Sequence, residues 1–364
     1  MKLFNQEKLQ RLKLVARWLW ILRVIRLPLL PIAFVARLRK RPDFLVADGF
    51  LIGDCVLLRP MLGAMCRKGR VRYIGGAHAK EILGDLGVEH EVFQWPWANY
   101  DYSVGSAFRL LSLWFRILVL QPRVIVEPRG DLRSLAVLYL TCPQRLAGYS
   151  FTGGAFMLDV DPALPEVVHL EEHNRVLATS LGLEYRLDDL FQTAGNGDGS
   201  VAISFSGSQP LKVMPTNVAK FIVQRLQKSG RRVSYLRGPG DFFLSVPENL
   251  ALLEEAKIPI KQESFKDYVS ILRRVSGYIG MDSGGGHLAS MFQKPSVIFL
   301  STQFSAYCGP RGKQAIFVES AESLACRPCA GVTCINDQYL RCLSIPEGRL
   351  LDALDEFNQR LGAA

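Results

Sequence analysis

The residues best suited to chemistry lie in one glycine-rich stretch, GMDSGGGHLA, at positions 280–289. An apolar pair precedes it and an apolar pattern of helical spacing follows it, so the sequence predicts a strand, a tight turn and a helix. Glycines without a Cβ let a ligand approach the backbone, and a helix N-terminus favours an anion. We therefore predict a phosphate-binding turn, the alternative being a turn whose glycines only allow tight packing. Its residues are Asp282, Ser283, Gly284, Gly285, Gly286 and His287.

A second candidate is the loop at 204–212, SFSGSQPLK, which follows a predicted strand. Hydroxyl groups such as that of Ser206 can donate hydrogen bonds to a diphosphate, and Lys212 adds a positive charge. The alternative is an ordinary solvated lysine. The position of the loop favours a ligand site, because ligands of open α/β sheets bind at the carboxyl ends of the strands.

The third candidate is Asp54, which comes after the first predicted strand and at the start of a helix. An aspartate in this position commonly caps the helix. It can also act as a general base if it faces a ligand. Position alone favours the cap.

Some expected motifs are absent from the sequence. No G-x-G-x-x-G follows the first strand, no G-K-[ST] P-loop occurs, and no paired-aspartate motif indicates a divalent ion. Dehydrogenase and NTPase functions therefore lack their signatures. Four of the eight cysteines cluster, and the first pair has the spacing of metal ligands, although the later spacings match no common zinc module. A structural zinc or iron site and four ordinary buried thiols both remain open for Cys326, Cys329, Cys334 and Cys342.

Strands and helices alternate along the chain in two series, which predicts parallel sheets covered by helices on both faces. The Gly/Asn/Asp-rich segment 195–200 separates the series, so we predict domains at 43–195 and 196–364. Two details accompany this prediction. The apolar segment 107–120 is expected to be a buried helix, and Trp95-Pro96-Trp97 is expected to expose aromatic surface.

The net charge of +10 is concentrated in residues 1–41, which hold eleven Lys or Arg and one Glu. A balanced remainder argues against a nucleic-acid-binding body. Residues 1–42 lack the features of a secretory signal, and their arginines and prolines interrupt any membrane-spanning run. An apolar stripe of Leu14, Trp18, Ile21 and Ile25 predicts a basic amphipathic helix on an anionic membrane. The alternative is a helix packed on the protein's own core.

Taken together, these motifs resemble glycosyltransferase family 9, the ADP-heptose:lipopolysaccharide heptosyltransferases. The resemblance runs from about Phe44 to the C-terminus and rests on IGDCVLLRP (52–60), LKVMP (211–215), MDSGGGHLA (281–289) and CLSIPEGRL (342–350). It implies an α/β GT-B fold, with two Rossmann-like domains facing across a cleft and the basic helical extension outside the match. The N-terminal domain would take the acceptor and the C-terminal domain the nucleotide-sugar.

The resemblance also implies roles for single residues. Asp54 falls on the catalytic base, Lys212 on the phosphate-binding lysine and Asp282 on the sugar-contacting acid. Ser283 and Gly284 fall on the diphosphate-binding turn. The acceptor side would include Arg129 and Asp131. A ribose-contacting glutamate has no equivalent at the counted position, Ile258, while Glu263 lies nearby.

Family 9 enzymes transfer sugar with inversion and need no catalytic metal, so the resemblance implies an enzyme without a required cofactor. Its expected partners are ADP-heptose, a lipid-linked oligosaccharide of the lipopolysaccharide core and the membrane surface. We therefore expect a peripheral protein on the cytoplasmic face of the inner membrane. A different nucleotide-sugar or a protein acceptor is the near alternative, and protein-directed relatives use a cysteine-bound iron. A catalytically inactive assembly protein is the alternative from another class.

Overall fold

The computed structural model describes residues 20–49, 51–98, 100–164, 168–193, 195–207, 209–261, 264–320, 324–329 and 333–363. The chain forms two compact units, Met1–Asp189 and Leu190–Ala364. The glycine-rich segment 195–200 belongs to the second unit: Asp198 N–H donates to the Arg274 carbonyl at 2.9 Å, and Gly199 N–H donates to Ser276 Oγ at 2.8 Å. Backbone hydrogen bonds thus fix this segment to the second unit.

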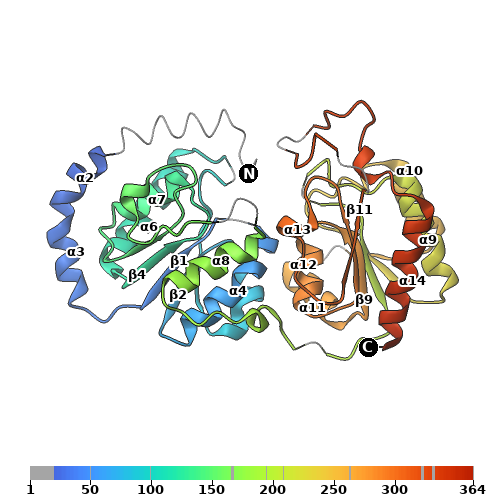
Figure 1. Cartoon of the computed structure of the whole chain (residues 1–364), viewed down its shortest axis with the longest axis horizontal. Coiled ribbons are helices and arrows are strands. Elements are labelled where there is room, and N and C mark those ends of the chain that lie inside the picture. The colour runs from blue at the N-terminus through green and yellow to red at the C-terminus, as the bar shows by residue number, and fades with distance from the viewer. Residues whose placement is uncertain are drawn as a thin grey trace. The chain divides into compact units, whose positions relative to one another are not determined.

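The first unit is built on a five-stranded parallel sheet in the order β3-β2-β1-β4-β5 (Figure 1). The central strand β1 is buried along its whole length, as its continuous apolar sequence FLVA predicts. The strands are β1 Phe44–Ala47, β2 Val71–Gly75, β3 Glu89–Val92, β4 Val124–Glu127 and β5 Leu146–Gly148.

Helices cover both faces of this sheet (Figure 1). On one face, α6 and α7 pack Leu113, Ile117 and Leu135 against the strands. On the other face, α4 packs against α8. The helices are α2 Ile21–Arg26, α3 Leu30–Arg37, α4 Ile52–Cys66, α5 Ala79–Leu83, α6 Val104–Leu120, α7 Leu132–Tyr139 and α8 Leu170–Ser180, with 3₁₀ turns at Leu27–Leu29, Gly84–Leu86, Ala155–Met157 and Leu187–Leu190.

Two expectations about apolar residues are wrong. The helix predicted at 107–120 is amphipathic rather than buried, because one stripe of α6 faces solvent: Val104, Phe108, Leu111 and Phe115 are each more than half exposed. Trp95 shows the reverse. It is only 1% exposed and packs against Phe93, with ring centroids 5.3 Å apart, instead of presenting aromatic surface.

The described part of the N-terminal segment lies on the first unit. Arg26 donates to the Pro143 carbonyl at 3.3 Å, and Arg37 donates to the Cys142 carbonyl at 2.6 Å. Ala33 and Ala36 are buried, whereas Ile21 and Ile25 of the predicted stripe are about half exposed. Residues 20–41 therefore both dock on the core and leave an apolar surface; Leu14 and Trp18 lie outside the described residues.

The second unit contains a six-stranded parallel sheet in the order β11-β10-β9-β6-β7-β8 (Figure 1). If β6 is counted as strand 1 of the unit and the sheet is read from β8 to β11, the order is the 3-2-1-4-5-6 of dinucleotide-binding folds. The strands are β6 Val201–Ser204, β7 Val233–Leu236, β8 Ile260–Lys261, β9 Gly277–Met281, β10 Ser296–Leu300 and β11 Ala315–Glu319.

Helices α9, α10 and α14 lie on one face of this sheet, and α11 and α12 lie on the other (Figure 1). The main core joins the first face to the strands through side chains such as Ile222, Leu253 and Phe357. The helices are α9 Thr216–Lys228, α10 Pro247–Glu255, α11 Phe265–Arg274, α12 Gly284–Met291, α13 Ser305–Cys308 and α14 Glu347–Ala363, with a 3₁₀ turn at Arg341–Leu343. No helix in the described ranges combines the length and the apolar character needed to cross a membrane.

Candidate active site

In the first unit, two charged residues meet where the strand order reverses, between β1 and β4. Asp54 lies in the first turn of α4, directly after the loop that follows β1, and Arg129 follows β4. Arg129 Nη2 and Asp54 Oδ1 are 2.8 Å apart, and Asp54 Oδ2 accepts from Leu51 N–H at 3.3 Å. The carboxylate is thus both part of a helix cap and a partly exposed group at the position where open α/β sheets bind ligands.

Buried acids surround Arg129. Burial disfavours the guanidinium cation, but Asp54, Asp48 and Glu127 more than offset this effect and raise its pKa. Burial also raises the pKa of Glu127 well above its usual range, with Asp131 adding to the shift, so Glu127 favours its neutral form. Arg129 is therefore a permanent cation, and its ion pair holds the Asp54 side chain in place.

Asp131, predicted on the acceptor side with Arg129, caps α7. Its side chain accepts a hydrogen bond from the backbone N–H of Arg133 at 2.9 Å. It also forms an ion pair with the Arg133 guanidinium, at 2.6 Å. The structure therefore brings Arg129 to Asp54 directly, whereas Asp131 pairs with a neighbour on its own helix.

The second unit has a matching ion pair where its strand order reverses, between β6 and β9. Lys212 lies in the loop after β6 and Asp282 directly follows β9. Lys212 Nζ is 2.8 Å from Asp282 Oδ2, and the two side chains are 18% and 4% exposed. The structure thus brings together two residues that are 70 positions apart in the sequence.

The lysine loop is held in a fixed shape. Gly207 N–H donates to the Lys212 carbonyl at 2.6 Å, and Ser301 Oγ donates to the Leu211 carbonyl at 2.8 Å. A Cβ at Gly207 would lie 2.7 Å from Lys212 Cβ, so glycine is required at this point. The loop therefore presents Lys212 in one position.

Ser206, predicted to bind phosphate, makes contacts within the protein. Its buried hydroxyl accepts from Phe242 N–H at 3.0 Å and donates to the Gly207 carbonyl at 3.3 Å. Beside it lies Asp241, which the sequence interpretation missed. Asp241 accepts from Tyr235 Oη at 2.9 Å, and burial raises its pKa. Only the sequence pattern Gly-Pro-Gly-Asp after β7 could have indicated this turn.

The three glycines of α12 differ in their surroundings. Ser283 and Gly284 are partly exposed at the helix N-terminus, where backbone N–H groups are available to an anion. A Cβ at Gly285 would lie 2.5 Å from Tyr278 Oη, and one at Gly286 would lie 2.9 Å from Ile298 Cδ1. Both of these glycines are buried and serve tight packing, which is the alternative considered for the turn.

Two further predicted residues complete this side. His287 is 6% exposed, and its backbone N–H donates to the Ser283 carbonyl at 3.4 Å. Glu263, the candidate for ribose binding, lies outside the described residues, and Ile258 is buried.

The four clustered cysteines line one small cavity of about 20 Å³ together with Leu324 and Leu340. Burial raises the pKa of Cys342 to about 11 and also raises that of Cys329. All four thiols are reduced, and among the residues described no three His, Cys, Asp or Glu side chains are arranged to hold a metal ion. The four cysteines therefore lie together, as predicted, but within the described residues their side chains are not arranged as ligands of a metal ion. Its members are Cys326, Cys329, Cys334 and Cys342.

No protein-family model and no curated protein sequence matches this chain. Comparison with solved structures identifies its fold class: two Rossmann-like α/β units in one chain, the GT-B fold of the family 9 heptosyltransferases.

Three of the similar structures illustrate the range of TM-scores and coverage. ADP-heptose lipopolysaccharide heptosyltransferase II of E. coli has a TM-score of 0.69 at 14% identity, covering 88% of this chain and 99% of that one. The family 9 glycosyltransferase of Veillonella parvula has a TM-score of 0.67 at 13% identity, covering 88% and 97%. The iron-containing, dodecameric TibC of enterotoxigenic E. coli has a TM-score of 0.55 at 14% identity, covering 89% and 77%. At these identities the likeness shows the fold.

Proposed function

We propose that this protein is an inverting glycosyltransferase that moves a sugar from a nucleoside diphosphate, with ADP-heptose the first candidate, to a hydroxyl of a lipid-linked oligosaccharide of the lipopolysaccharide core. The observation that carries the proposal is the Lys212–Asp282 ion pair, 2.8 Å long, at the strand reversal of the second unit and beside the N-terminus of α12. Its fold neighbours support the donor: a TibC structure contains ADP-D-beta-D-heptose.

The donor diphosphate would lie against Lys212 and the first turn of α12. An ammonium group has three N–H donors, so Lys212 can hold Asp282 and a phosphate oxygen at the same time. The buried carboxylate fixes the direction of the lysine, and the helix N-terminus adds favourable electrostatics. Asp282 would thus act by positioning Lys212, besides any contact it makes with the sugar.

The reaction would be a single displacement. Asp54 accepts the proton of the acceptor hydroxyl as the oxygen forms a bond to the anomeric carbon, while the bond from that carbon to the diphosphate breaks. Lys212 and the amides at the start of α12 stabilise the negative charge that develops on the departing diphosphate. The proton ends on Asp54, and the electron pair of the broken bond ends on the nucleoside diphosphate.

The test is ADP binding by calorimetry on the full chain, comparing Lys212→Met with Lys212→Arg. Loss of a charge-assisted phosphate contact worth about 1.5–3 kcal/mol should weaken binding roughly 10- to 100-fold in Lys212→Met, with partial recovery in Lys212→Arg. The matched control is Lys220→Met, since Lys220 is exposed on α9. Equal affinity in all variants, or no ADP binding by the native protein, would refute the donor assignment. If the native protein bound no nucleoside diphosphate at all, the inactive assembly protein would be the better description.

The sugar and acceptor have a near alternative, a different nucleotide-sugar or a protein acceptor on the same fold. A thermal-shift screen of nucleotide-sugars separates these donors, because a ligand that binds only the folded state stabilises it by mass action. The largest shift is expected with ADP-heptose, and a larger shift with a UDP- or GDP-sugar would replace that assignment.

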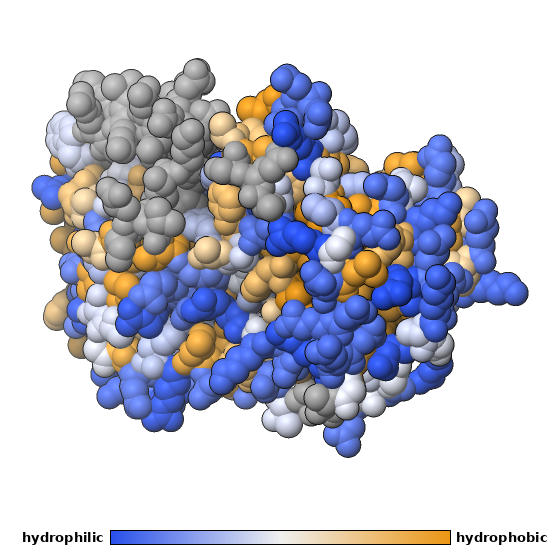
Figure 2. Space-filling view, turned by 45° about the vertical axis from the view of Figure 1, so that its right-hand side comes forward, coloured by the Kyte–Doolittle hydropathy of each residue, from blue (hydrophilic) through white to orange (hydrophobic). Residues whose placement is uncertain are grey.

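We also propose that the first unit attaches the protein to the cytoplasmic face of an anionic inner membrane. The exposed stripe of α6 lies next to exposed side chains of α2 and α3, since α3 packs against α6. Figure 2 shows hydrophobic and hydrophilic side chains together along the left-hand edge of the molecule. The cations Arg39 and Lys40 are exposed at the end of α3. Apolar area with adjoining cations is the pattern of interfacial binding. The apolar side chains are Trp20, Ile21, Val24, Ile25, Leu27, Leu30, Ile32, Phe34, Val35, Leu38, Val104, Phe108, Leu111 and Phe115.

Vesicle pelleting tests the membrane proposal without removing the segment, whose arginines anchor it to the core. Phe108→Ser with Phe115→Ser should reduce binding to phosphatidylglycerol vesicles about 10-fold or more, since burying one Phe contributes roughly 1.5–3 kcal/mol. Ile335→Ser, at an exposed apolar residue of the second unit, is the control. Unchanged pelleting of the double variant would contradict this face.

A structural zinc or iron at the cysteine cluster forms a separate proposal, supported by the four thiols around one cavity and by the iron-containing TibC. The thiols must move together to share an ion, and no reaction step uses it. Metal analysis should find about one equivalent, lost in Cys326→Ser with Cys329→Ser; Cys66→Ser is the control. Metal-free native protein would leave the cluster as four apolar thiols.

A further inference from the structure

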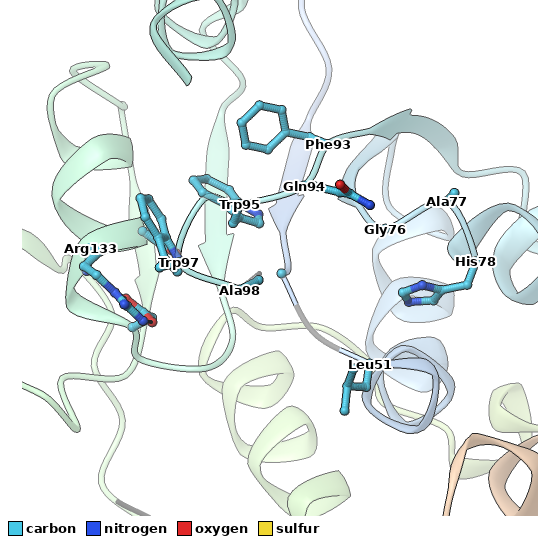
Figure 3. A pocket seen from close by; sticks show the side chains of 13 residues that line it. Leu51, Gly76, Ala77, His78, Phe93, Gln94, Trp95, Trp97, Ala98 and Arg133 are labelled. Carbon is cyan, nitrogen blue, oxygen red and sulfur yellow. Dashed lines mark hydrogen bonds and ion pairs between the residues drawn. The ribbon is translucent and has the colours of Figure 1, made fainter. Parts of the chain in front are cut away.

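A cavity of about 520 Å³ opens in the first unit, next to the loops that follow β1, β2 and β3 (Figure 3). Figure 3 shows Trp95 and Trp97 on one side of it and His78 on the other, with Leu51 below. Leu51 connects the cavity to the proposed base, because its N–H donates to Asp54 Oδ2 at 3.3 Å. A molecule in the cavity would therefore lie next to the start of α4.

The cavity carries little net charge. Its lining contains one carboxylate and one guanidinium, Asp131 and Arg133, and these are joined by hydrogen bonds of 2.6 and 3.0 Å. Burial lowers the pKa of His78, which keeps its imidazole neutral at physiological pH. Among the described residues that line the cavity, the one guanidinium that could attract an anionic ligand is thus already paired with a carboxylate.

Aromatic rings form one wall. The rings of Trp95 and Trp97 are 5.1 Å apart between centroids, and the Arg133 guanidinium lies 5.4 Å from the centroid of Trp97. A Cβ at Gly49 would lie 2.7 Å from Trp95 Cδ1, so glycine at this position makes room for the indole. Trp97 is half-buried and offers part of its surface, while Trp95 is held in place.

One donor in this wall lacks a partner. Trp95 is 1% exposed, and its indole Nε1 makes no hydrogen bond to any described residue. A buried N–H without an acceptor costs free energy, so such groups ordinarily have a partner. Because this atom is enclosed by the protein, it is a cost of packing Trp95 into the wall and not a contact for a ligand. An apolar cavity with a few placed polar groups is the usual form of a small-molecule site.

We propose that this cavity binds an uncharged pyranose unit of the acceptor, with the C–H face of the sugar against the exposed part of Trp97. The proposal rests on the proposed glycosyltransferase function and names its acceptor class: a neutral sugar, not a phosphorylated or carboxylated one. The neutral lining and the aromatic wall both favour that class.

Saturation-transfer NMR on the full chain tests this with four methyl glycosides: the neutral glucoside, galactoside and mannoside, and the anionic glycoside of 3-deoxy-D-manno-octulosonic acid. We expect at least one neutral glycoside to bind, with its ring protons receiving the strongest transfer. Exclusive binding of the anionic glycoside, or binding of none of the four, would overturn the proposal.

Two variants locate the binding. Trp97→Ala should abolish detectable binding, and Trp97→Phe, which keeps an aromatic ring at this position, should retain part of it. The control is Trp114→Phe, at a tryptophan packed elsewhere in the same unit. Unchanged binding in Trp97→Ala would refute the site. ADP calorimetry on the same samples separates the two claims: intact ADP binding without sugar binding refutes the cavity assignment alone.

Discussion

The proposed reaction depends on Asp54 as the general base. Its ion pair with Arg129 fixes the position of the carboxyl group. Asp54→Asn keeps the size and the hydrogen bond to Leu51 but removes the proton acceptor. We expect sugar transfer to fall by about 100- to 10,000-fold, the usual contribution of a general base, with unchanged ADP affinity. ADP release under saturating donor and acceptor measures the first quantity, and calorimetry measures the second. Native-like turnover would disprove the role.

His173 predicts how the first unit responds to acid. It is 4% exposed and packs against both Tyr149 and Phe151. Burial, with repulsion from Arg129, lowers its pKa to about 4. The unfolded chain takes up this proton near pH 6.5, earlier than the folded chain does. Stability is therefore full above pH 6.5 and declines as the pH falls toward 4, by up to about 3 kcal/mol.

The measurement is the denaturant midpoint of the native protein and of His173→Gln at several values between pH 7.5 and pH 4. The variant should lose less stability over this interval, whatever its stability at pH 7.5, because glutamine does not titrate. Parallel curves for the two proteins would show that other groups dominate the acid response.

At the scale of elements, α12 tests the packing of the glycine turn. The Cβ of Gly285→Ala would lie 2.5 Å from Tyr278 Oη and 2.6 Å from Tyr268 Oη. We expect a loss of about 1–3 kcal/mol, the usual cost of overpacking, together with weaker ADP binding because the helix start moves. Gly348→Ala is the control, since a Cβ there meets nothing within 4 Å and should be neutral or slightly stabilising. Equal stability of both variants would rule out this packing role.

The sequence pattern predicted the central elements well and the peripheral ones poorly. The sequence predicts strands at 44–47, 71–74, 277–281 and 296–300, and β1, β2, β9 and β10 match these ranges within one residue. Continuous apolar runs bounded by turns mark buried parallel strands. Six helices and strands in the described ranges were not predicted: β5, α8, α10, β8, α13 and β11. The two-residue β8 and three-residue β5 are too short for a periodic signal, while α10 and β11 are only partly buried.

The candidate site divides in the same way. The glycine turn, Lys212 and Asp282 could be found from the sequence because each follows a recognisable strand. The ion pairs that join Lys212 to Asp282 and Asp54 to Arg129 could not, because strand order decides which loops become neighbours. Nor could the cavity wall: Trp95-Pro96-Trp97 has no period, and only tertiary packing shows that Trp95 is buried.

At the scale of the whole molecule, each unit has its own hydrophobic core. We expect calorimetry to show two unfolding transitions, of which ADP raises only the one belonging to the second unit. At 100 times its dissociation constant, ADP should add about 2.7 kcal/mol, and the 10- to 100-fold weaker binding expected of Lys212→Met should reduce this gain to about 0.4–1.4 kcal/mol at the same concentration. One cooperative transition, or an ADP shift shared by both, would contradict independent cores.

The separate cores have a consequence for how such enzymes diversify. The proposed donor site lies in the second unit, Leu190–Ala364, and the proposed acceptor site lies in the first, Met1–Asp189. A chimera that joins Met1–Asp189 to the C-terminal unit of a related transferase would keep the acceptor preference of this protein and take the donor preference of the other. New sugar linkages could then arise by recombining halves, without redesign of either interior.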